Sequence, residues 1–313
     1  MALPSVSIII LTKNAGKRLK AVLDGVFSNI KAFDAEVLIV DSGSTDETKG
    51  IISGYPARFI EIGPDSFGHG KTRNLGAREA RGEVLVYLTQ DAIPCNKEWL
   101  STLVANLNAP GVAGAFGRQL PEEGSSPIER FYLSYLYPGR RIVRDSLDPG
   151  NCLLKDMFFS NVNSAILKCE WEKRKFNEQL IMSEDQEWSR AVLLAGRKIV
   201  YDPQAAVFHS HKYTLKQLIT RNFDSGVSLR KLVSASLGSS LRYEMNYLAE
   251  GMRFFAKNNS YASMILFPFY ELVRLLSFAL GFHSSFLPLF IKKLLSQHKY
   301  YWFSGNSCQK GPP

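Results

Sequence analysis

Apolar positions between residues 6 and 108 follow two alternating patterns. A short apolar run is typical of a strand buried in a parallel sheet, and Val6–Leu11 is such a run. Further strands are predicted at Ala35–Val40, Ala57–Ile62 and Val84–Thr89. Apolar residues at helical spacing predict helices at Arg18–Ile30, Lys71–Arg81 and Glu98–Asn108. Ser44–Glu47 has side chains that can accept the free N–H groups of a first turn, so another helix is expected to begin there. The alternation predicts an α/β fold with a mostly parallel sheet flanked by helices.

After the last of these helices the pattern loosens. Pro121–Ser126 is expected to be a turn-rich loop, and Arg140–Lys155, which has little periodicity, is interpreted as a mobile loop. Regular patterns then return, with strands predicted at Phe158–Leu167, Lys198–Tyr201 and Ala205–Phe208, and a helix at Glu184–Leu194. The chain is mostly helical after about Thr214. We therefore divide it into an α/β part, residues 1–215, and a helical part, residues 216–313.

Composition narrows the class of protein. With 45% hydrophobic residues the chain can bury a large core, which excludes wholesale disorder. A net charge of +9 suits anionic lipids, phosphorylated ligands or nucleic acid. The basic residues carry no aromatic stacking motif, which argues against nucleic acid as a partner. The four cysteines form no CxxC pair and no zinc-like cluster, which fits a reducing compartment, and the first strand does not resemble a secretory signal.

Polar residues follow the second predicted strand. Asp41 stands at its carboxyl end, Gly43 allows tight backbone geometry, and Asp46 lies where a helix is expected to begin. Ligands of parallel sheets bind at the carboxyl ends of strands, and a helix N-terminus offers free N–H groups. The segment therefore predicts a ligand contact, and a turn with a capping box is the structural alternative.

Two further segments carry candidate chemistry in the first half of the chain. Two glycines precede Lys71 and Arg73, whose cations can pair with a diphosphate, although the spacing is not that of a Walker A loop. Asp91 follows the fourth predicted strand. A carboxylate at this position can bind a hard divalent cation or cap a helix.

The second half adds adjacent carboxylates and a histidine pair. Glu184 and Asp185 begin a predicted helix, where they can interact with the helix dipole or place a general base in a cleft. His209 and His211 end a predicted strand, on the same face of it. Their imidazoles can bind a metal ion, although an isolated histidine is more often structural.

In this order, the segments resemble the inverting GT-A glycosyltransferases of family 2, and most closely their bacterial rhamnosyltransferase branch. The resemblance rests on Ser7–Asn14, Val40–Asp46, Gly68–Asn74, Leu88–Ala92, Ser160–Asn161, Ser183–Asp185 and His209. Weaker similarity follows at Arg274, Leu287–Pro288 and Ser296–Trp302. It implies a Rossmann-like GT-A catalytic domain over residues 1–215, with a nucleotide-binding half to about residue 118 and an acceptor half from about residue 119. An amphipathic helical region, residues 216–313, would follow.

The resemblance also implies roles for individual residues. Thr12 and Asp41 would contact the base and ribose of a nucleotide sugar, and Arg73 would lie near its diphosphate. The rest of the donor site would comprise Asn14, Ser42, Asp46, Asn74, Gln90, Asp91 and Asn161. Asp185 would be the catalytic base, supported by Glu184.

The implied cofactor is a divalent cation, either Mg²⁺ or Mn²⁺. Asp91 would be the ligand left from the family's Asp-x-Asp motif, because Thr89 replaces the first aspartate. His209 would be a second ligand, with His211 as the rival assignment. The reduced motif also fits an alternative, a non-catalytic nucleotide-sugar-binding or membrane-scaffold protein.

By the same resemblance, the reaction transfers L-rhamnose from dTDP-L-rhamnose to a glycan or lipid-linked precursor of a bacterial surface polysaccharide. Such an enzyme is expected in the cytoplasm, peripherally bound to the inner face of the cell membrane. A homo-oligomer is compatible with this interpretation.

Apolar segments interrupted by charges characterise residues 263–303. The longest uncharged stretch, Leu275–Ile291, contains Pro288 and is shorter than the ~20 apolar residues that a membrane span needs. We expect helices that lie in the membrane interface, with Lys292–Lys293 and Tyr300–Trp302 near the head groups. The alternatives are a buried helical subdomain, a dimer interface and, least favoured, a true span.

Overall fold

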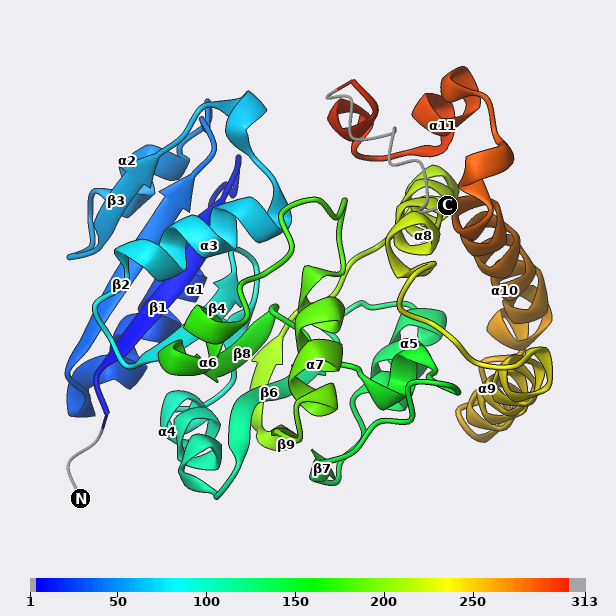
Figure 1. The fold of residues 1–313 in the computed structure, drawn as a ribbon, viewed down its shortest axis with the longest axis horizontal. Coiled ribbons are helices and arrows are strands. Elements are labelled where there is room, and N and C mark those ends of the chain that lie inside the picture. The colour runs from blue at the N-terminus through cyan, green and yellow to red at the C-terminus, as the bar shows by residue number, and fades with distance from the viewer. Residues whose placement is uncertain (1–3, 304–313) are drawn as a thin grey trace.

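The computed structural model describes residues 4–303, so residues 304–313 of the predicted helical part lie outside the description. A central sheet is covered by helices, and a further layer of helices stands at one side (Figure 1). The sheet has nine strands, in the order β3-β2-β1-β4-β8-β6-β9-β5, with β7 paired to β9. The strands are β1 (Val6–Thr12), β2 (Ala35–Asp41), β3 (Arg58–Glu61), β4 (Val84–Thr89), β5 (Ile93–Pro94), β6 (Val112–Leu120), β7 (Ile142–Arg144), β8 (Asn163–Leu167) and β9 (Lys198–Phe208).

Strand direction changes in the middle of the sheet. β1 is parallel to β2 and β4, and β2 is parallel to β3, as the βα pattern predicted. β8 is antiparallel to both of its neighbours, β4 and β6, whereas β6 and β9 are parallel. The α/β fold class with flanking helices is thus confirmed, and the sheet is mixed in its second half.

Different helices cover the two faces of the sheet, because alternate residues of a strand point in opposite directions. On β1, Ile8 and Ile10 belong to the core cluster that includes α1 and α4, whereas Ile9 belongs to the cluster that includes α3 and α7. The α-helices between β1 and β9 are α1 (Arg18–Asn29), α2 (Thr48–Ile52), α3 (His69–Glu79), α4 (Trp99–Ala105), α5 (Pro127–Leu136), α6 (Lys168–Lys173) and α7 (Glu184–Leu194).

Three local predictions were wrong. The helix expected to begin at Ser44 begins instead at Thr48, because the backbone N–H and hydroxyl of Ser44 are both bonded to Asp41. The loop predicted over Arg140–Lys155 contains a strand, β7, which pairs antiparallel with β9. The two strands predicted between Lys198 and Phe208 are a single strand, β9.

The strand β6 was not predicted. Gly114 and Gly117 interrupt its apolar pattern, and both are required by close approaches. A Cβ atom on Gly117 would lie 1.8 Å from the carbonyl oxygen of Ala205 in β9. The glycines therefore let β6 lie close to its neighbours while they weaken its pattern in the sequence.

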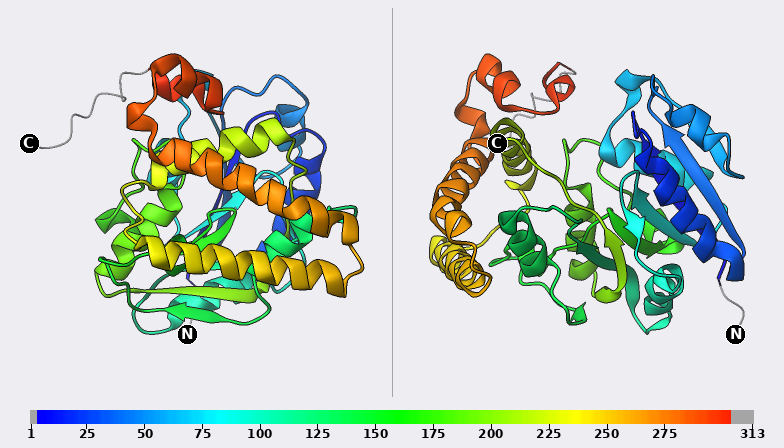
Figure 2. Two further views of the ribbon diagram at one scale, coloured as in Figure 1. Left: turned by 90° about the vertical axis from the view of Figure 1, so that its right-hand side faces the viewer. Right: turned by 180° about the vertical axis from the view of Figure 1, so that it is seen from behind.

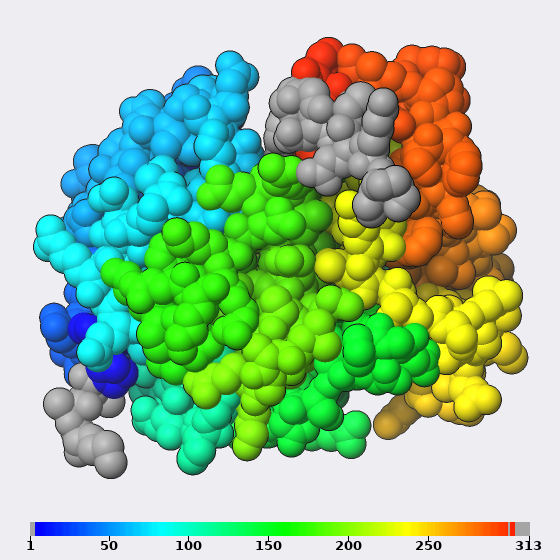
Figure 3. Space-filling view, viewed as in Figure 1, coloured from blue at the N-terminus to red at the C-terminus, as the bar shows by residue number. Residues whose placement is uncertain are grey.

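In the part of the chain that the structure describes, four α-helices follow the sheet and confirm the helical C-terminal region. They are α8 (Leu215–Leu229), α9 (Leu237–Lys257), α10 (Tyr261–Phe282) and α11 (Leu289–Leu295). The helices α9 and α10 lie next to each other on one side of the molecule (Figure 2). The space-filling view shows a notch between the N-terminal part, in blue and cyan, and the red C-terminal helices (Figure 3).

α10 packs directly on α8 through two glycines. A Cβ atom on Gly226 would lie 2.2 Å from the carbonyl oxygen of Phe278, and one on Gly281 would lie 2.0 Å from that of Phe223. These approaches leave no room for side chains, so the helix pair is held in a close crossing.

Among the described residues, one helix is long and apolar enough to cross a membrane by length and composition, and it is α10. The uncharged stretch Leu275–Ile291 is not one helix, because α10 ends at Phe282 and α11 begins at Leu289. Trp302, which was expected near lipid head groups, is instead buried beside Phe223.

Candidate active site

The ends of β1 and β2 are joined around one buried carboxylate. Asp41 is 0% exposed, and its Oδ1 accepts hydrogen bonds from the backbone N–H groups of Gly43 (3.0 Å) and Ser44 (2.7 Å). Its Oδ2 accepts from the hydroxyls of Thr12 (2.7 Å) and Ser44 (2.6 Å). Burial alone would raise the pKa of Asp41, but these donors outweigh it and lower the pKa. Asp41 and Thr12 thus shape the loop, and their contact with a nucleotide stays a prediction.

Further polar contacts fix the two loops beside this carboxylate. Asn14, which has a positive φ of 47°, donates its N–H to the Ser44 hydroxyl and accepts from the N–H of Thr45. Asp46 accepts hydrogen bonds from the N–H groups of Gly16 and Thr48. The loops are therefore preorganised by residues that were predicted to bind the donor.

The third strand end, that of β4, is tied to the same loops. Gln90 accepts from the N–H of Lys13 (2.7 Å) and donates to its carbonyl (3.2 Å). The ammonium of Lys13 donates to the carbonyls of Ser42 and Gly43. Ser42 itself bonds the carbonyl of Thr12 through both its N–H and its hydroxyl. The strand ends of β1, β2 and β4 thus form one connected surface.

Asp91, His209 and His211 meet beside this surface and form a candidate metal centre. Their ligand atoms all lie within 4.8 Å of one another. The Nε2 atom of His209 lies 3.4 Å from Oδ1 of Asp91, and that of His211 lies 3.8 Å from Oδ2. This span is close to the diameter of a coordination shell with metal–ligand distances of ~2.1–2.3 Å. The three residues fit one divalent cation, and both histidines face it.

Gln119, at the end of β6, orients the buried histidine of this cluster. Its Oε1 lies 2.8 Å from Nδ1 of His209. Because an amide oxygen only accepts, Nδ1 carries a proton, and Nε2 is the ring nitrogen that faces Asp91. The Gln119 amide in turn donates to the hydroxyls of Tyr137 and Ser160. This is the arrangement expected for a metal-binding histidine.

Charged neighbours hold the remaining parts of the cluster. Arg18 donates to the carbonyl of Asp91 (2.9 Å) and forms a two-pronged ion pair with Glu122. Glu129 of α5 accepts from the N–H of His211. Burial would raise the pKa of the Asp91 carboxyl, but a hydrogen bond from His209 and the positive charges that His209 and His211 carry when protonated outweigh it and lower the pKa well below its usual range. Asp91 is therefore ionised, as a metal ligand must be.

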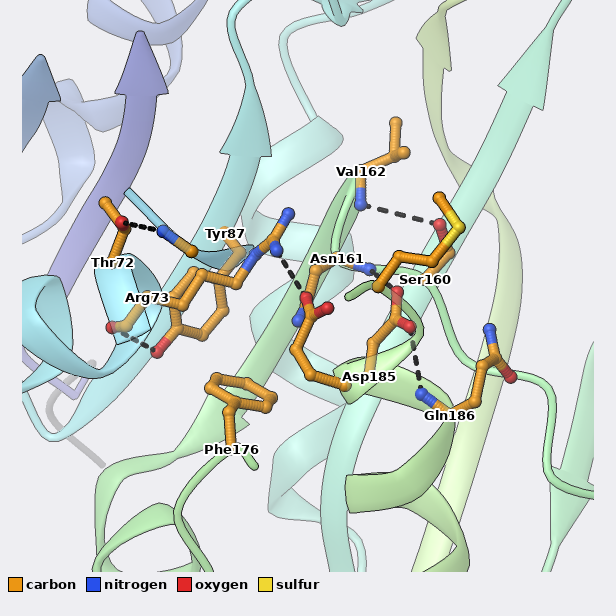
Figure 4. A network of polar contacts seen from close by, with 12 residues as sticks. Thr72, Arg73, Tyr87, Ser160, Asn161, Val162, Phe176, Asp185 and Gln186 are labelled. Carbon is orange, nitrogen blue, oxygen red and sulfur yellow. Dashed lines mark hydrogen bonds and ion pairs between the residues drawn. The ribbon is translucent and has the colours of Figure 1, made fainter. Parts of the chain in front are cut away.

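Asp185 and Glu184 stand at the start of α7 in different environments. Glu184 is 3% exposed and forms a buried ion pair with Arg73 of α3. Oδ2 of Asp185 accepts from the N–H of Asn161 (3.1 Å), and Oδ1 accepts from that of Gln186 (2.9 Å) (Figure 4). Ser183, just before the helix, has a φ of 65°, which sets the direction in which the helix begins.

The pKa of Asp185 is raised to about 7. Burial is the largest cause, and the adjacent Glu184 carboxylate adds to it, while Arg73 opposes both. A carboxylate that gains proton affinity in this way is suited to accept a proton near neutral pH.

A chain of contacts connects the metal cluster to Asp185. His209 bonds Gln119, and Gln119 bonds the Ser160 hydroxyl. The next residue, Asn161, donates its N–H to Asp185. The prediction that these residues share one site is thus supported by connectivity, although their roles in binding and catalysis stay predictions.

Two residues that were predicted to bind the nucleotide-sugar donor make contacts within the protein instead. Asn74 is buried, donates to the carbonyl of Phe176, and accepts from the Trp171 indole and the Phe176 N–H. It therefore holds the segment between α6 and α7. Arg73 is engaged by Glu184, so its predicted position near a diphosphate has no direct support in the structure.

Sequence reasoning did not find Gln119, Arg18 and Glu122. Gln119 carried one available signal, a polar residue at the carboxyl end of a strand, but β6 itself was not recognised. The pairing of Arg18 with Glu122 joins residues 104 positions apart, and neither lies in a recognisable motif.

Comparison with known proteins places the whole chain among glycosyltransferases. Residues 7–168 match the family model described as glycosyl transferase family 2. The O-antigen chain rhamnosyltransferase WbaN of Salmonella anatum is 31% identical over 306 residues, which cover 96% of each chain. The O-antigen chain rhamnosyltransferase RfbN of Salmonella typhimurium is 30% identical, over 95% of this chain and 96% of the relative.

Solved structures support the fold. The mannosyltransferase PcManGT from Pyrobaculum calidifontis, solved in complex with GDP-Man and Mn²⁺, has a TM-score of 0.55 at 17% identity and covers 97% of this chain and 84% of its own. Glucosyl-3-phosphoglycerate synthase from Mycobacterium tuberculosis, solved with Mn²⁺, UDP-glucose and glycerol 3-phosphate, has a TM-score of 0.53 at 17% identity, over 74% of this chain and 80% of its own. At these identities the likeness concerns the fold alone.

Proposed function

This chain belongs to glycosyl transferase family 2, and on that premise we propose that it transfers L-rhamnose from dTDP-L-rhamnose to a lipid-linked saccharide precursor of an O-antigen. The observation that carries the proposal is the similarity, over nearly the full chain, to two O-antigen chain rhamnosyltransferases. The enzyme would act in the cytoplasm, at the inner face of the cell membrane.

Asp185 is the proposed catalytic base. Its carboxylate accepts the proton of the acceptor hydroxyl while that oxygen bonds to the anomeric carbon of the donor. The bond from this carbon to the phosphate oxygen breaks, and the nucleoside diphosphate leaves from the opposite side, so the configuration inverts. The raised pKa of Asp185 supports this assignment, since a base works best with a pKa near the working pH.

Asp91, His209 and His211 are the proposed ligands of the cofactor. The bound cation would neutralise the charge that develops on the leaving diphosphate, a contribution of several kcal/mol. We propose Mn²⁺ rather than Mg²⁺, because Mg²⁺ is bound mainly through oxygen, whereas two of these three ligands are imidazoles. The assignment includes both histidines, so His211 complements His209.

The same cluster weighs against a non-catalytic function. Thr89 stands where the Asp-x-Asp motif has its first carboxylate, so one carboxylate ligand is missing. His211 offers a third ligand atom beside those of Asp91 and His209. A protein that only bound nucleotide sugars would have no need of a half-buried Asp185 with a raised pKa next to an ion-paired Glu184.

Donor identity is tested by thermal unfolding with a panel of nucleotide sugars and MnCl₂. At a hundredfold excess over Kd, the true donor is expected to stabilise the protein by ~2.7 kcal/mol through mass action. We expect this shift with dTDP-L-rhamnose and a smaller one with UDP-glucose or GDP-mannose. An equal or larger shift with either of the latter two would refute the proposed donor.

The base assignment predicts a pH dependence. Only ionised Asp185 can accept the proton, so kcat/KM should fall about tenfold per pH unit below its apparent pKa and level off above it. With a pKa of about 7, the decline should begin near neutrality rather than near pH 4. The measurement is kcat/KM from about pH 5 to about pH 9, with the donor Kd at each pH as the control. A profile that is flat down to about pH 5 would contradict the assignment.

A further inference from the structure

The outward side of α10 carries no charged or strongly polar residue. Every exposed residue of this helix is apolar or aromatic. Most of the larger ones recur every three or four positions and form one stripe along the whole helix, with Leu266 beside it: Tyr261, Ile265, Phe269, Leu272, Leu276 and Leu280. Ile265 is 76% exposed. A helix on a water-facing surface normally shows the opposite distribution.

The two charges of α10 are directed into the protein instead. Glu271 is 2% exposed. Arg274 donates to Glu271 (2.5 Å) and to Glu244 of α9 (2.7 Å), and its guanidinium lies over the ring of Tyr247. Since charged groups are expensive to bury without partners, this network is what allows α10 to keep its outer side free of charge.

The neighbouring helix continues the apolar surface and adds a polar edge. Leu237, Leu241, Met245 and Met252 are exposed in a line along α9. A second exposed line, one residue further on, consists of Arg242, Asn246, Glu250, Arg253 and Lys257. The left view of Figure 2 faces this side of the molecule, and no other described element covers α9 or α10 there.

Net charge is concentrated in the same region. Of the described residues, 216–303 contain 11 Lys and Arg against 4 Asp and Glu, a net charge of +7, whereas residues 4–215 have a net charge of only +1. The basic residues include Lys292 and Lys293 on α11, next to Phe290, which is 71% exposed. Exposed apolar area beside a strong positive charge is the combination that binds anionic lipid surfaces.

We propose that the outer faces of α9 and α10, with α11 at their edge, form a membrane platform that lies flat on an anionic bilayer. A second copy of the chain is a poorer occupant of this surface, because a symmetric contact would bring together two helical regions whose described residues, 216–303, each carry a net charge of +7. A span through the bilayer is disfavoured, since α10 would have to lose its glycine contacts with α8 and expose Glu271 and Arg274 to lipid.

The platform is packed against the elements that hold the candidate metal centre. Phe131 of α5 packs on Phe255 of α9 and Phe267 of α10. Two residues earlier, Glu129 bonds the N–H of His211. The docked platform would therefore fix the active site next to the bilayer. The placement of the active site next to the bilayer rests on the proposed function, because it assumes that the lipid-linked acceptor lies in the same membrane surface. Binding of the platform to a bilayer does not depend on the proposed function.

The test is sedimentation of the full chain with vesicles of phosphatidylcholine that contain about one third phosphatidylglycerol. The wild type should bind these vesicles and bind pure phosphatidylcholine at least about tenfold more weakly. The double substitution Ile265→Glu with Phe269→Glu should lower binding to the anionic vesicles at least about tenfold. Leu194→Glu, at an exposed apolar position on α7, is the matched control and should bind as the wild type does.

Further variants and measurements test the orientation of α10 on the bilayer and the alternative that this surface binds a second copy of the chain. Ile265→Trp and Leu276→Trp should be quenched equally by shallow brominated lipids if α10 lies flat, and a marked depth difference would overturn the flat platform. Failure of the wild type to bind anionic vesicles would overturn the proposal, as would a dimer that Ile265→Glu with Phe269→Glu dissociates. Transfer to a water-soluble acceptor, measured without vesicles, should be unchanged in this variant, so loss of membrane binding is distinguishable from loss of the proposed enzymatic function.

Discussion

Replacing Asp185 by asparagine is expected to lower kcat/KM by ~10²–10⁴ while donor binding survives, because the change removes proton acceptance and little else. Asparagine has the same shape, and its amide oxygen can still accept one of the two backbone N–H groups that now contact the carboxylate. The measurements are initial rates of rhamnosyl transfer and the donor Kd from calorimetry.

Variants of the neighbouring carboxylates separate catalysis from structure. Glu184→Gln removes the charge that pairs with Arg73, so it is expected to destabilise the protein as well, since an unpaired buried charge remains. Glu187→Gln lies in the first turn of the same helix, outside the contact chain, and is the matched control. If Asp185→Asn kept wild-type turnover, Asp185 would not be the base, whatever the donor proves to be.

The first part of the sheet could be predicted from the sequence better than the second part. β1, β2, β4 and α1 follow from local periodicity, because buried parallel strands and amphipathic helices each leave a characteristic pattern. The direction of β8 does not follow in this way. After β6 the chain forms α5 and β7 before β8 pairs between β4 and β6. Pairing between segments that are so far apart in the chain leaves no pattern in the local sequence.

The same distinction applies to the site. Asp91, His209 and Asp185 stand at ends of elements, where a polar residue after an apolar run is visible in the sequence. The partners that determine their chemistry come from elsewhere in the chain. Arg73 and Glu184 are 111 positions apart, and Gln119 and His209 are 90 apart. Likewise, the inward direction of Glu271 could not be predicted, since hydropathy treats every charge as a break in an apolar helix.

Removing divalent ions is expected to lower the transfer rate by about 10³-fold, because the developing charge on the leaving diphosphate would lose a stabilisation of several kcal/mol. The measurement is turnover after exhaustive chelation, followed by titration with MnCl₂ or MgCl₂. Mn²⁺ should restore activity at lower concentration than Mg²⁺, given two imidazole ligands beside one carboxylate. Full activity in excess chelator would eliminate the proposed metal role.

Individual ligand variants then decide which residues hold the ion. His209→Ala and His211→Ala should each weaken Mn²⁺ binding, measured by calorimetry, and the effect at His209 should be larger. His209 is buried and oriented by Gln119, whereas the His211 side chain is 37% exposed and its ring has no comparable hydrogen bond to a residue within 4–303. His283→Ala, at an exposed position after α10, is the matched control and should leave Mn²⁺ affinity unchanged. A variant of His211 that binds Mn²⁺ as the wild type does would reduce the protein ligands to Asp91 and His209, and the donor's phosphates would then have to supply more of the shell.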